Sequence, residues 1–449
     1  MTTPKKLPTL LPLSLAIASA LLAVAPLAQA QNLVELYESA RAFDATYQSA
    51  RAQYEANVFR ADQAKAGILP AANLAAGASR SQFENTNPVT DRNFSTTNAT
   101  LSATQPLYRP GNWASYEQGK KQVDLAQAQL VSAEQDLILR VSQAYFDVLA
   151  SQDSLTFVRA QKAAVAEQLA SAKRNFEVGT TTITDTREAQ ARYDLVIAQE
   201  IAADNDLRVK KIALDQLVGR TGTQPHPLAV PVALPALLPD DINVWVQQAE
   251  DSHPGVRQTQ LALEIARLET RKAEAGHKPT LDLTANHTVT RNPSGTATSL
   301  NTLSSRSTIT NLGLTFNLPL FAGFATQNRI KETLALEDKA QADLDGAKRI
   351  VAQTTRTAFL GVVSGQGQVK ALEAAEASSQ SALDANKLGY QVGVRINIDV
   401  LNSQSQLFQT KRDLAQARYN VLLGDLKLRQ ANGSLTPGNL QQINALLAR

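Results

Sequence analysis

Two hydrophobic periodicities alternate along the chain, and together they predict its elements. In Leu312–Leu320 every second residue is apolar. A period of two is typical of a strand with one apolar and one polar face. Much longer segments have helical spacing, and the last of them carries an apolar residue at every seventh position: Val400, Leu407, Leu414, Val421 and Leu428. This repeat favours a coiled-coil seam against the preceding long helix over the core of an ordinary bundle.

The same order of elements is predicted twice: a helix, two strands around a polar turn, a very long helix and a returning helix. In the first half these are helix Leu33–Ala66, strands within Leu74–Leu107 around the turn Asn85–Asn93, and a long helix that follows Pro110-Gly111 and runs to about Phe176. A returning helix comes next, which Asp185 is placed to cap and which reaches about Val218. In the second half they are helix Ile242–Ala275, strands Thr280–Val289 and Leu312–Leu320 around the turn Asn292–Arg306, a long helix from about Ala322 to Leu388, and a returning helix over about Asn397–Ala431. A helix of about 66 residues is about 100 Å long, which indicates a coiled coil or a helical array.

The turns between the long and the returning helices share residues at one constant separation. The matched pairs are Phe176 and Tyr390, Val178 and Val392, Gly179 and Gly393, and Asp185 and Asp399. Glycine tolerates the left-handed backbone of a helix end, so Gly179 and Gly393 are the expected hinges. We therefore divide the mature chain into a first repeat (31–219), a proline-rich linker (220–241), a second repeat (242–433) and a short C-terminal tail (434–449).

The first thirty residues have the pattern of a secretory signal peptide. Lys5 and Lys6 precede an apolar run, and Ala28-Gln29-Ala30 forms a cleavage site, so the mature chain is expected to begin at Gln31. Prolines within the run argue against the alternative, an N-terminal membrane anchor. After this segment there is no apolar run of about 18 residues, so a secreted chain of this kind is either soluble or inserts as a β-barrel.

Composition excludes several classes of function. The chain has no cysteine and a formal net charge of +3, so thiolate metal sites, a lipid anchor on cysteine and a nucleic-acid partner are not expected. The four histidines form no HExxH or paired-histidine motif, and no Gly-rich phosphate loop is present. We expect no catalytic residues, no metal and no cofactor. The chain is not expected to be an enzyme.

The predicted strands favour a transmembrane barrel over a sheet that packs on the helices. Each hairpin stands between long polar helices that offer no apolar face to cover it. Four strands cannot close a barrel, because at least eight are needed. The barrel therefore requires an oligomer in which each protomer contributes two hairpins.

Six motifs carry a resemblance to a known family: Ala144–Leu149, Phe176–Gly179 with Ile183–Asp185, Lys278–Thr284, Leu314–Leu320, Gly389–Gly393 with Asp399–Leu401, and Ala415–Asn420. Together they cover nearly the whole mature chain, which resembles the TolC family of outer-membrane channel proteins of type I secretion and multidrug efflux. The resemblance implies a mainly α-helical homotrimer with a twelve-stranded barrel in outer-membrane lipid and a helical tunnel across the periplasm. It also implies a periplasmic adaptor and an inner-membrane ABC or proton-driven transporter as partners.

The resemblance also assigns residues to a gate at the far end of the tunnel. Tyr390 and Arg395 near the second turn are expected to tie it to Thr184 and Asp185 near the first. The family places two acidic residues at the narrowest point; the matching positions here are Asp399 and Asn402, so the second carboxylate is replaced by a neutral amide. A ring of three carboxylates rather than six weakens the case for strong divalent-cation plugging but preserves a preference for cations.

Other readings of these residues stay open at this stage. Asp185 and Asp399 could serve only as helix caps. Gly361, Gly365 and Gly367 inside the second long helix allow either a bend or a close crossing. The whole chain could instead be a soluble periplasmic coiled-coil protein, as a spacer or chaperone, or a constitutively open porin. The expected function is a gated outer-membrane duct that exports proteins and/or small toxic compounds.

Overall fold

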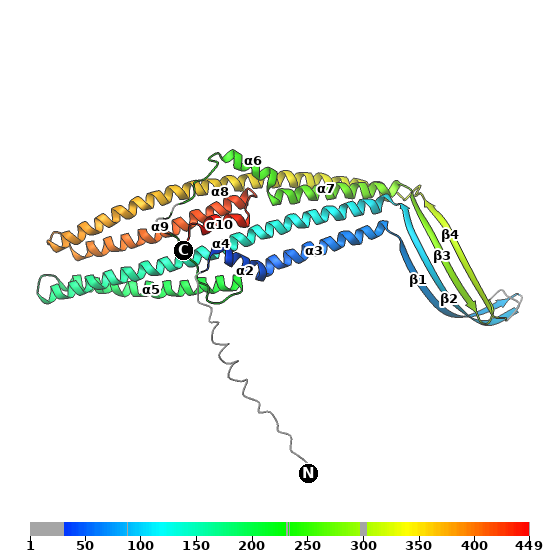
Figure 1. The fold of residues 1–449 in the computed structure, drawn as a ribbon, viewed down its shortest axis with the longest axis horizontal. Helices are drawn as coiled ribbons and strands as arrows, with labels where there is room; N and C mark the ends of the chain where they lie inside the picture. The colour runs from blue at the N-terminus through cyan, green and yellow to red at the C-terminus, as the bar shows by residue number, and fades with distance from the viewer. Residues whose placement is uncertain (1–30, 88, 230–231, 233, 297–302, 449) are drawn as a thin grey trace, which may run out of the picture.

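The computed structural model describes residues 31–448 except 88, 230–231, 233 and 297–302. The expected signal peptide, residues 1–30, lies outside the described residues. The molecule is elongated, with its helices bundled along most of its length and a bent sheet at one end (Figure 1). None of the described helices combines the length and the apolar character that a membrane span requires.

The described elements follow the predicted order twice. The first half contains α2 (Leu33–Phe43), α3 (Ala45–Lys65), a 3-10 turn (Ala66–Ile68), β1 (Ala71–Thr86), β2 (Val89–Tyr108), α4 (Pro110–Glu177) and α5 (Ile183–Val218). The second half contains α6 (Ile242–Ser252), α7 (Pro254–Glu274), a 3-10 turn (Ala275–His277), β3 (Thr280–Asn292), β4 (Ser305–Asn317), α8 (Ala325–Gln391) and α9 (Asn397–Ala431), and α10 (Pro437–Asn444) follows it. The duplicated, mainly helical fold with four strands is confirmed.

The first helix of each half is broken in two, so the prediction of single helices over Leu33–Ala66 and Ile242–Ala275 was wrong. At Asp44 the backbone has an extended conformation. Its carboxylate accepts a hydrogen bond from the N–H of Tyr47 and two from the guanidinium of Arg140, at 2.8 and 3.0 Å. At His253 the backbone is also extended, because the ring of Pro254 disfavours a helical residue before it. Pro254 was therefore a visible signal of the second break.

The strands are longer at the end far from the helices than predicted. β1 and β2 pair through Thr86 and Val89, so most of the expected turn Asn85–Asn93 is strand. β3 runs on to Asn292 and β4 begins at Ser305, which is its register partner. β4 ends at Asn317 and not at Leu320, since Pro319 has no N–H for a ladder. Backbone pairing thus extends each hairpin through sequence that reads as polar turn.

The four strands form one antiparallel sheet in the order β1-β2-β3-β4, and the register sorts its side chains onto two faces. One face is mostly apolar and includes Leu74, Leu101, Leu283, Val289, Leu312, Leu314 and Phe316. The other face is mostly polar and includes Asn98, Thr100, Thr284, Asn286, Thr288 and Asn311. The apolar face is uncovered in one protomer, where Leu74 is 76% and Leu314 65% exposed. The predicted alternation is confirmed, and so is the lack of a helical partner for the hairpins.

The seven-residue row of α9 is buried against α8. Val400 and Leu407 pack with Leu383, and further along the helices Val421 packs with Val369. This confirms α8 as the partner of the seam. A neighbouring row on α9 faces another helix, because Leu401 packs with side chains of α4 and α5. The return helix therefore holds the two halves of the chain together.

The three glycines of α8 do not act alike. A Cβ on Gly365 would lie 3.0 Å from Cγ2 of Val421, so this glycine permits a close crossing of α8 and α9. A Cβ on Gly361 or Gly367 would meet nothing within 4 Å. The helix is unbroken at all three positions. The close crossing is confirmed for one of the three.

Candidate gate at the helical turns

The turns that join α4 to α5 and α8 to α9 lie at the end of the molecule opposite the sheet (Figure 1). Both have one geometry. In the first, the N–H of Gly179 donates to the carbonyl of Phe176 and that of Thr180 to Asn175, with Gly179 at φ 74°. In the second, Gly393 (φ 79°) donates to Tyr390 and Val394 to Gly389. These are two Schellman motifs, which explains the matched glycines.

The restart of the returning helix differs between the two turns. Thr182 caps α5 and forms a capping box with Asp185, so Asp185 is the third residue of α5 rather than its cap as predicted. The matching position to Thr182 is Ile396, whose side chain makes no capping bond. Asp399 therefore takes part in no capping box of the kind that Asp185 forms, and its carboxylate lies 3.6 Å from the guanidinium of Arg395.

Asn397 is the centre of the contacts between the two hairpins. It is 1% exposed, its side-chain oxygen accepts from the amide of Gln168, and its amide donates to the backbone carbonyl of Asp185 at 3.2 Å. A buried amide with both ends bonded holds the start of α9 against α4 and α5 together.

Two further hydrogen bonds cross between the hairpins near the same end. The amide of Asn175 donates to the hydroxyl of Tyr390 at 3.3 Å, and Arg192 donates to the side-chain oxygen of Asn402 at 2.8 Å. In contrast, the amide of Asn386 donates to Ser403 within the α8–α9 hairpin itself. Mutations can therefore compare contacts between the two hairpins with a contact inside one hairpin.

The predicted tie residues are gathered at this end, but within one protomer they pair differently from the prediction. Tyr390 bonds Asn175, Arg395 pairs with Asp399, and Thr184 is exposed. Asp185 receives a bond from the other hairpin only at its backbone carbonyl.

Sequence reasoning missed several of the residues that bridge the hairpins, and the repeat itself contained a signal for them. All of them differ from their counterparts in the other half: Asn175 matches Gly389, Asn397 matches Ile183, Arg192 matches Gln406 and Gln168 matches Ala382. Asn402, which was predicted for the constriction and not for a bridge, also differs, since it matches Glu188. A search for polar residues that break the repeat would have found them.

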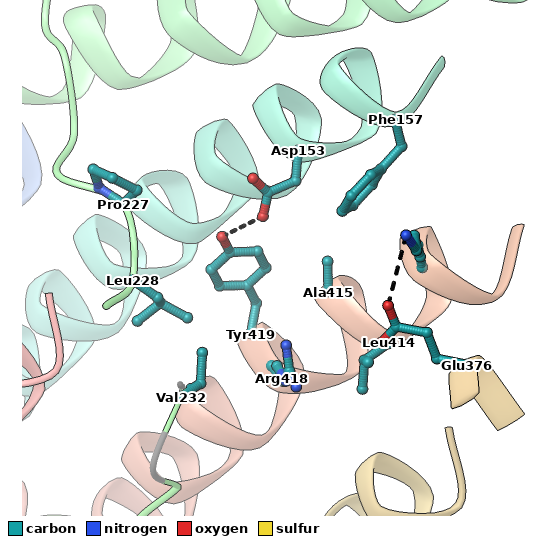
Figure 2. A pocket seen from close by; sticks show the side chains of 11 residues that line it. Asp153, Phe157, Pro227, Leu228, Val232, Glu376, Leu414, Ala415, Arg418 and Tyr419 are labelled. Carbon is teal, nitrogen blue, oxygen red and sulfur yellow. Dashed lines mark hydrogen bonds and ion pairs between the residues drawn. The ribbon is translucent and has the colours of Figure 1, made fainter. Parts of the chain in front are cut away.

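A cavity of about 470 Å³ lies in the helical body away from the turns, where α4, the linker, α8 and α9 meet (Figure 2). Tyr419 donates a hydrogen bond of 2.7 Å to Asp153 at its wall. Burial raises the pKa of Asp153, and burial together with that carboxylate raises the pKa of Tyr419. At 1.5 Å per residue Tyr419 is about 30 Å along α9 from the turn, so this pair belongs to the wall of the body and not to the gate.

Comparison with known proteins agrees with this architecture. The model of the outer membrane efflux protein family matches residues 36–220 and 245–434. The chain is 32% identical to outer membrane protein TolC of Escherichia coli strain K12 over 457 residues, which cover 99% of this chain and 90% of that protein. It is 30% identical to the proteases secretion protein PrtF of Dickeya chrysanthemi over 434 residues, covering 93% and 91%. The crystal structure of outer membrane protein VceC of Vibrio cholerae superposes with a TM-score of 0.76 at 19% identity, covering 89% of this chain and 96% of that one.

Within the described residues, no group of three or more histidine, aspartate or glutamate side chains is arranged to hold a metal ion. The fold, the family model over both halves and the full-length relatives agree with one another. The chain belongs to the outer membrane efflux protein family, and it is a non-enzymatic export channel of the outer membrane.

Proposed function

We propose that three copies of this chain form a gated duct that exports proteins, small toxic compounds or both. Each protomer supplies four strands to a twelve-stranded barrel and two helical hairpins to a periplasmic tunnel. The free edges of β1 and β4 support this assembly, because unpaired edges and an uncovered apolar face need partners. Four strands are also too few to close a barrel.

The proposed partners are a periplasmic adaptor and an inner-membrane transporter, either an ABC protein or a proton-driven pump. The chain itself offers no nucleotide motif, so the energy for export has to come from elsewhere. One relative is named for the secretion of proteases, which supports a protein cargo. A deletion strain assayed for both secreted protein and drug sensitivity separates the two cargo classes.

The tunnel is proposed to be closed where α4 turns into α5 and α8 into α9. The single observation that carries this proposal is the buried side chain of Asn397, which bonds to both helices of the other hairpin. Contacts that exist only in the closed arrangement bias a closed–open equilibrium toward closure. The expected ties of Tyr390 and Arg395 to Thr184 and Asp185 remain part of the proposal as contacts of the assembled trimer, with Gly179 and Gly393 as hinges.

Asp399 is proposed to line the constriction together with Asn402. Its carboxylate is partly exposed, and in this protomer the guanidinium of Arg395 is its ion-pair partner. Three such carboxylates around a pore attract cations and repel anions. The amide of Asn402 brings no charge, so divalent cations are expected to bind less strongly than at a ring of six carboxylates.

Planar bilayer recordings test the gate against the alternative of a constitutively open porin. The gated duct predicts small openings that grow when Arg395→Ser or Tyr390→Phe removes a side-chain contact near the turn. Heat-resistant trimers in the outer-membrane fraction test the assembly separately. A large conductance in the unmodified protein, unchanged in both variants, would establish the open porin instead.

A further inference from the structure

Three arginines lie on the apolar face of the sheet, toward the end far from the helices. Arg291 of β3 and Arg306 of β4 are direct register partners, and Arg80 of β1 follows one row further out, opposite Ser95 of β2. All three side chains are exposed. In the row immediately before them, Val289 faces Ala99 and Thr308, and it is the last apolar side chain of this face on β3 before Arg291.

Their height on the sheet matches the outer boundary of a membrane. From Leu281, in the first apolar row, to Arg291 the strand rises about 34 Å at 3.4 Å per residue. With a strand tilt of about 40° this is about 26 Å along the membrane normal, close to the apolar band of about 25 Å found on outer-membrane barrels. Exposed aromatic side chains stand at the other boundary, namely Tyr108, Trp113, Phe316, Phe321 and Phe324.

The arginine pair is unfavourable without a counter-ion. Directly opposite side chains on antiparallel strands have Cβ atoms about 5 Å apart, and like charges in such a pair destabilise the sheet. Within the described part of the chain, none of the three guanidinium groups makes an ion pair or a side-chain hydrogen bond. On the same face the nearest carboxylates are the register partners Glu84 and Asp91, two rows beyond Arg80. An anion from outside the chain, held between Arg291 and Arg306, would remove this repulsion.

The geometry selects phosphate. A guanidinium fork donates two parallel hydrogen bonds to phosphate oxygens, and two forks side by side can neutralise one dianionic monoester. Arg80 lies two strands and one row away from Arg291, about 12 Å by strand and residue spacing. A second phosphate on the same head group could reach it.

We propose that Arg80, Arg291 and Arg306 form a binding site for a lipid head group that carries two phosphate monoesters, in the outer leaflet around the barrel. The proposal rests on the barrel described under the proposed function, since only then does the apolar face meet lipid. It adds a ligand to a surface that has no part in transport or gating.

Binding of bisphosphorylated lipid A to the purified full-length protein tests the site. The variant is R291Q/R306Q, which keeps polar side chains of similar length. The matched control is R349Q/R356Q, which removes the same charge from exposed positions on α8, and R291K/R306K retains the charge without the fork. Removing charge-assisted hydrogen bonds is expected to raise the dissociation constant of R291Q/R306Q by about tenfold or more, with the control unchanged and the lysine variant in between.

Two results would overturn the assignment. One is equal affinity of the unmodified protein and R291Q/R306Q for lipid A, and the other is equal affinity of the unmodified protein for lipid A and its dephosphorylated form. Conductance of the unmodified protein in phosphatidylcholine bilayers, which contain no phosphate monoester, is measured in parallel. Channels in that bilayer uphold the proposed function even if the lipid site fails, whereas their absence counts against the duct and against the barrel on which the lipid site rests.

Discussion

Replacing Asn397 by alanine should open the channel. The side chain makes one hydrogen bond to Gln168 and one to the carbonyl of Asp185, and both cross between the hairpins. At about 1 kcal/mol net for each bond, the closed arrangement loses about 2 kcal/mol per protomer. Since about 1.4 kcal/mol changes an equilibrium constant tenfold, the open-to-closed ratio rises about 30-fold per protomer.

The measurement is the open probability and conductance of single channels in planar bilayers. Asn386→Ala is the matched control, because it deletes the same side chain from a bond to Ser403 that stays within one hairpin. With one bond lost instead of two, it should cost about 1 kcal/mol of stability and leave the open probability unchanged. Both variants must first run as heat-resistant trimers. If Asn397→Ala trimers open no more often than the unmodified protein, or if Asn386→Ala opens them equally, the bonds of Asn397 do not hold the gate.

Three other expectations follow from the described contacts. Asp399→Asn should weaken the preference for cations, and a reversal potential that stays where it was in a salt gradient would count against the carboxylate ring. Tyr419→Phe leaves the partly buried Asp153 without its donor and should cost about 1–3 kcal/mol at neutral pH. Because burial raises the pKa of Asp153, the charged carboxylate is costly above that pKa. The stability lost in Tyr419→Phe should therefore shrink as the pH falls and the carboxyl becomes protonated; a stability loss that is independent of pH in thermal melts would contradict this reasoning. Arg140→Gln should cost about 1–3 kcal/mol at neutral pH. The hydrogen bond from Arg140 lowers the pKa of Asp44, so the stabilisation by this bond is fully present above the ordinary pKa of aspartate and is lost as the pH falls through the lowered pKa of Asp44. Urea midpoints of the unmodified protein and Arg140→Gln that do not converge in acid would refute this expectation.

The long elements were predictable because their signals are long. Sixty and more residues of helical spacing without proline leave little choice for α4 and α8. The seven-residue period of α9 predicted its seam, and the short connection to α8 predicted the partner. The short interruptions were harder to predict. At the first break Asp44 caps α3 through the N–H of Tyr47 and also accepts from Arg140, almost a hundred residues away in the chain, and no local pattern predicts that second partner.

The candidate gate was predicted in place but not in its contacts. The matched glycines and aspartates located both turns, because Schellman motifs and caps are local structures with local signals. The packing of α4, α5 and α9 side by side decides which side chains bridge the hairpins. No single segment of the sequence predicts that packing. Tyr390 bonds Asn175 rather than Thr184 or Asp185 for this reason.

The bridging residues of the turns are those in which the two halves of the chain have diverged, and this bears on the symmetry of the proposed ring. Six identical hairpins would have to close by one self-complementary contact repeated six times, and would open all together or not at all. A polypeptide that carries both hairpins can place a donor on one and its acceptor on the next. The ring then has three-fold symmetry with two distinct kinds of contact between neighbouring hairpins. One kind of contact can break while the other stays formed.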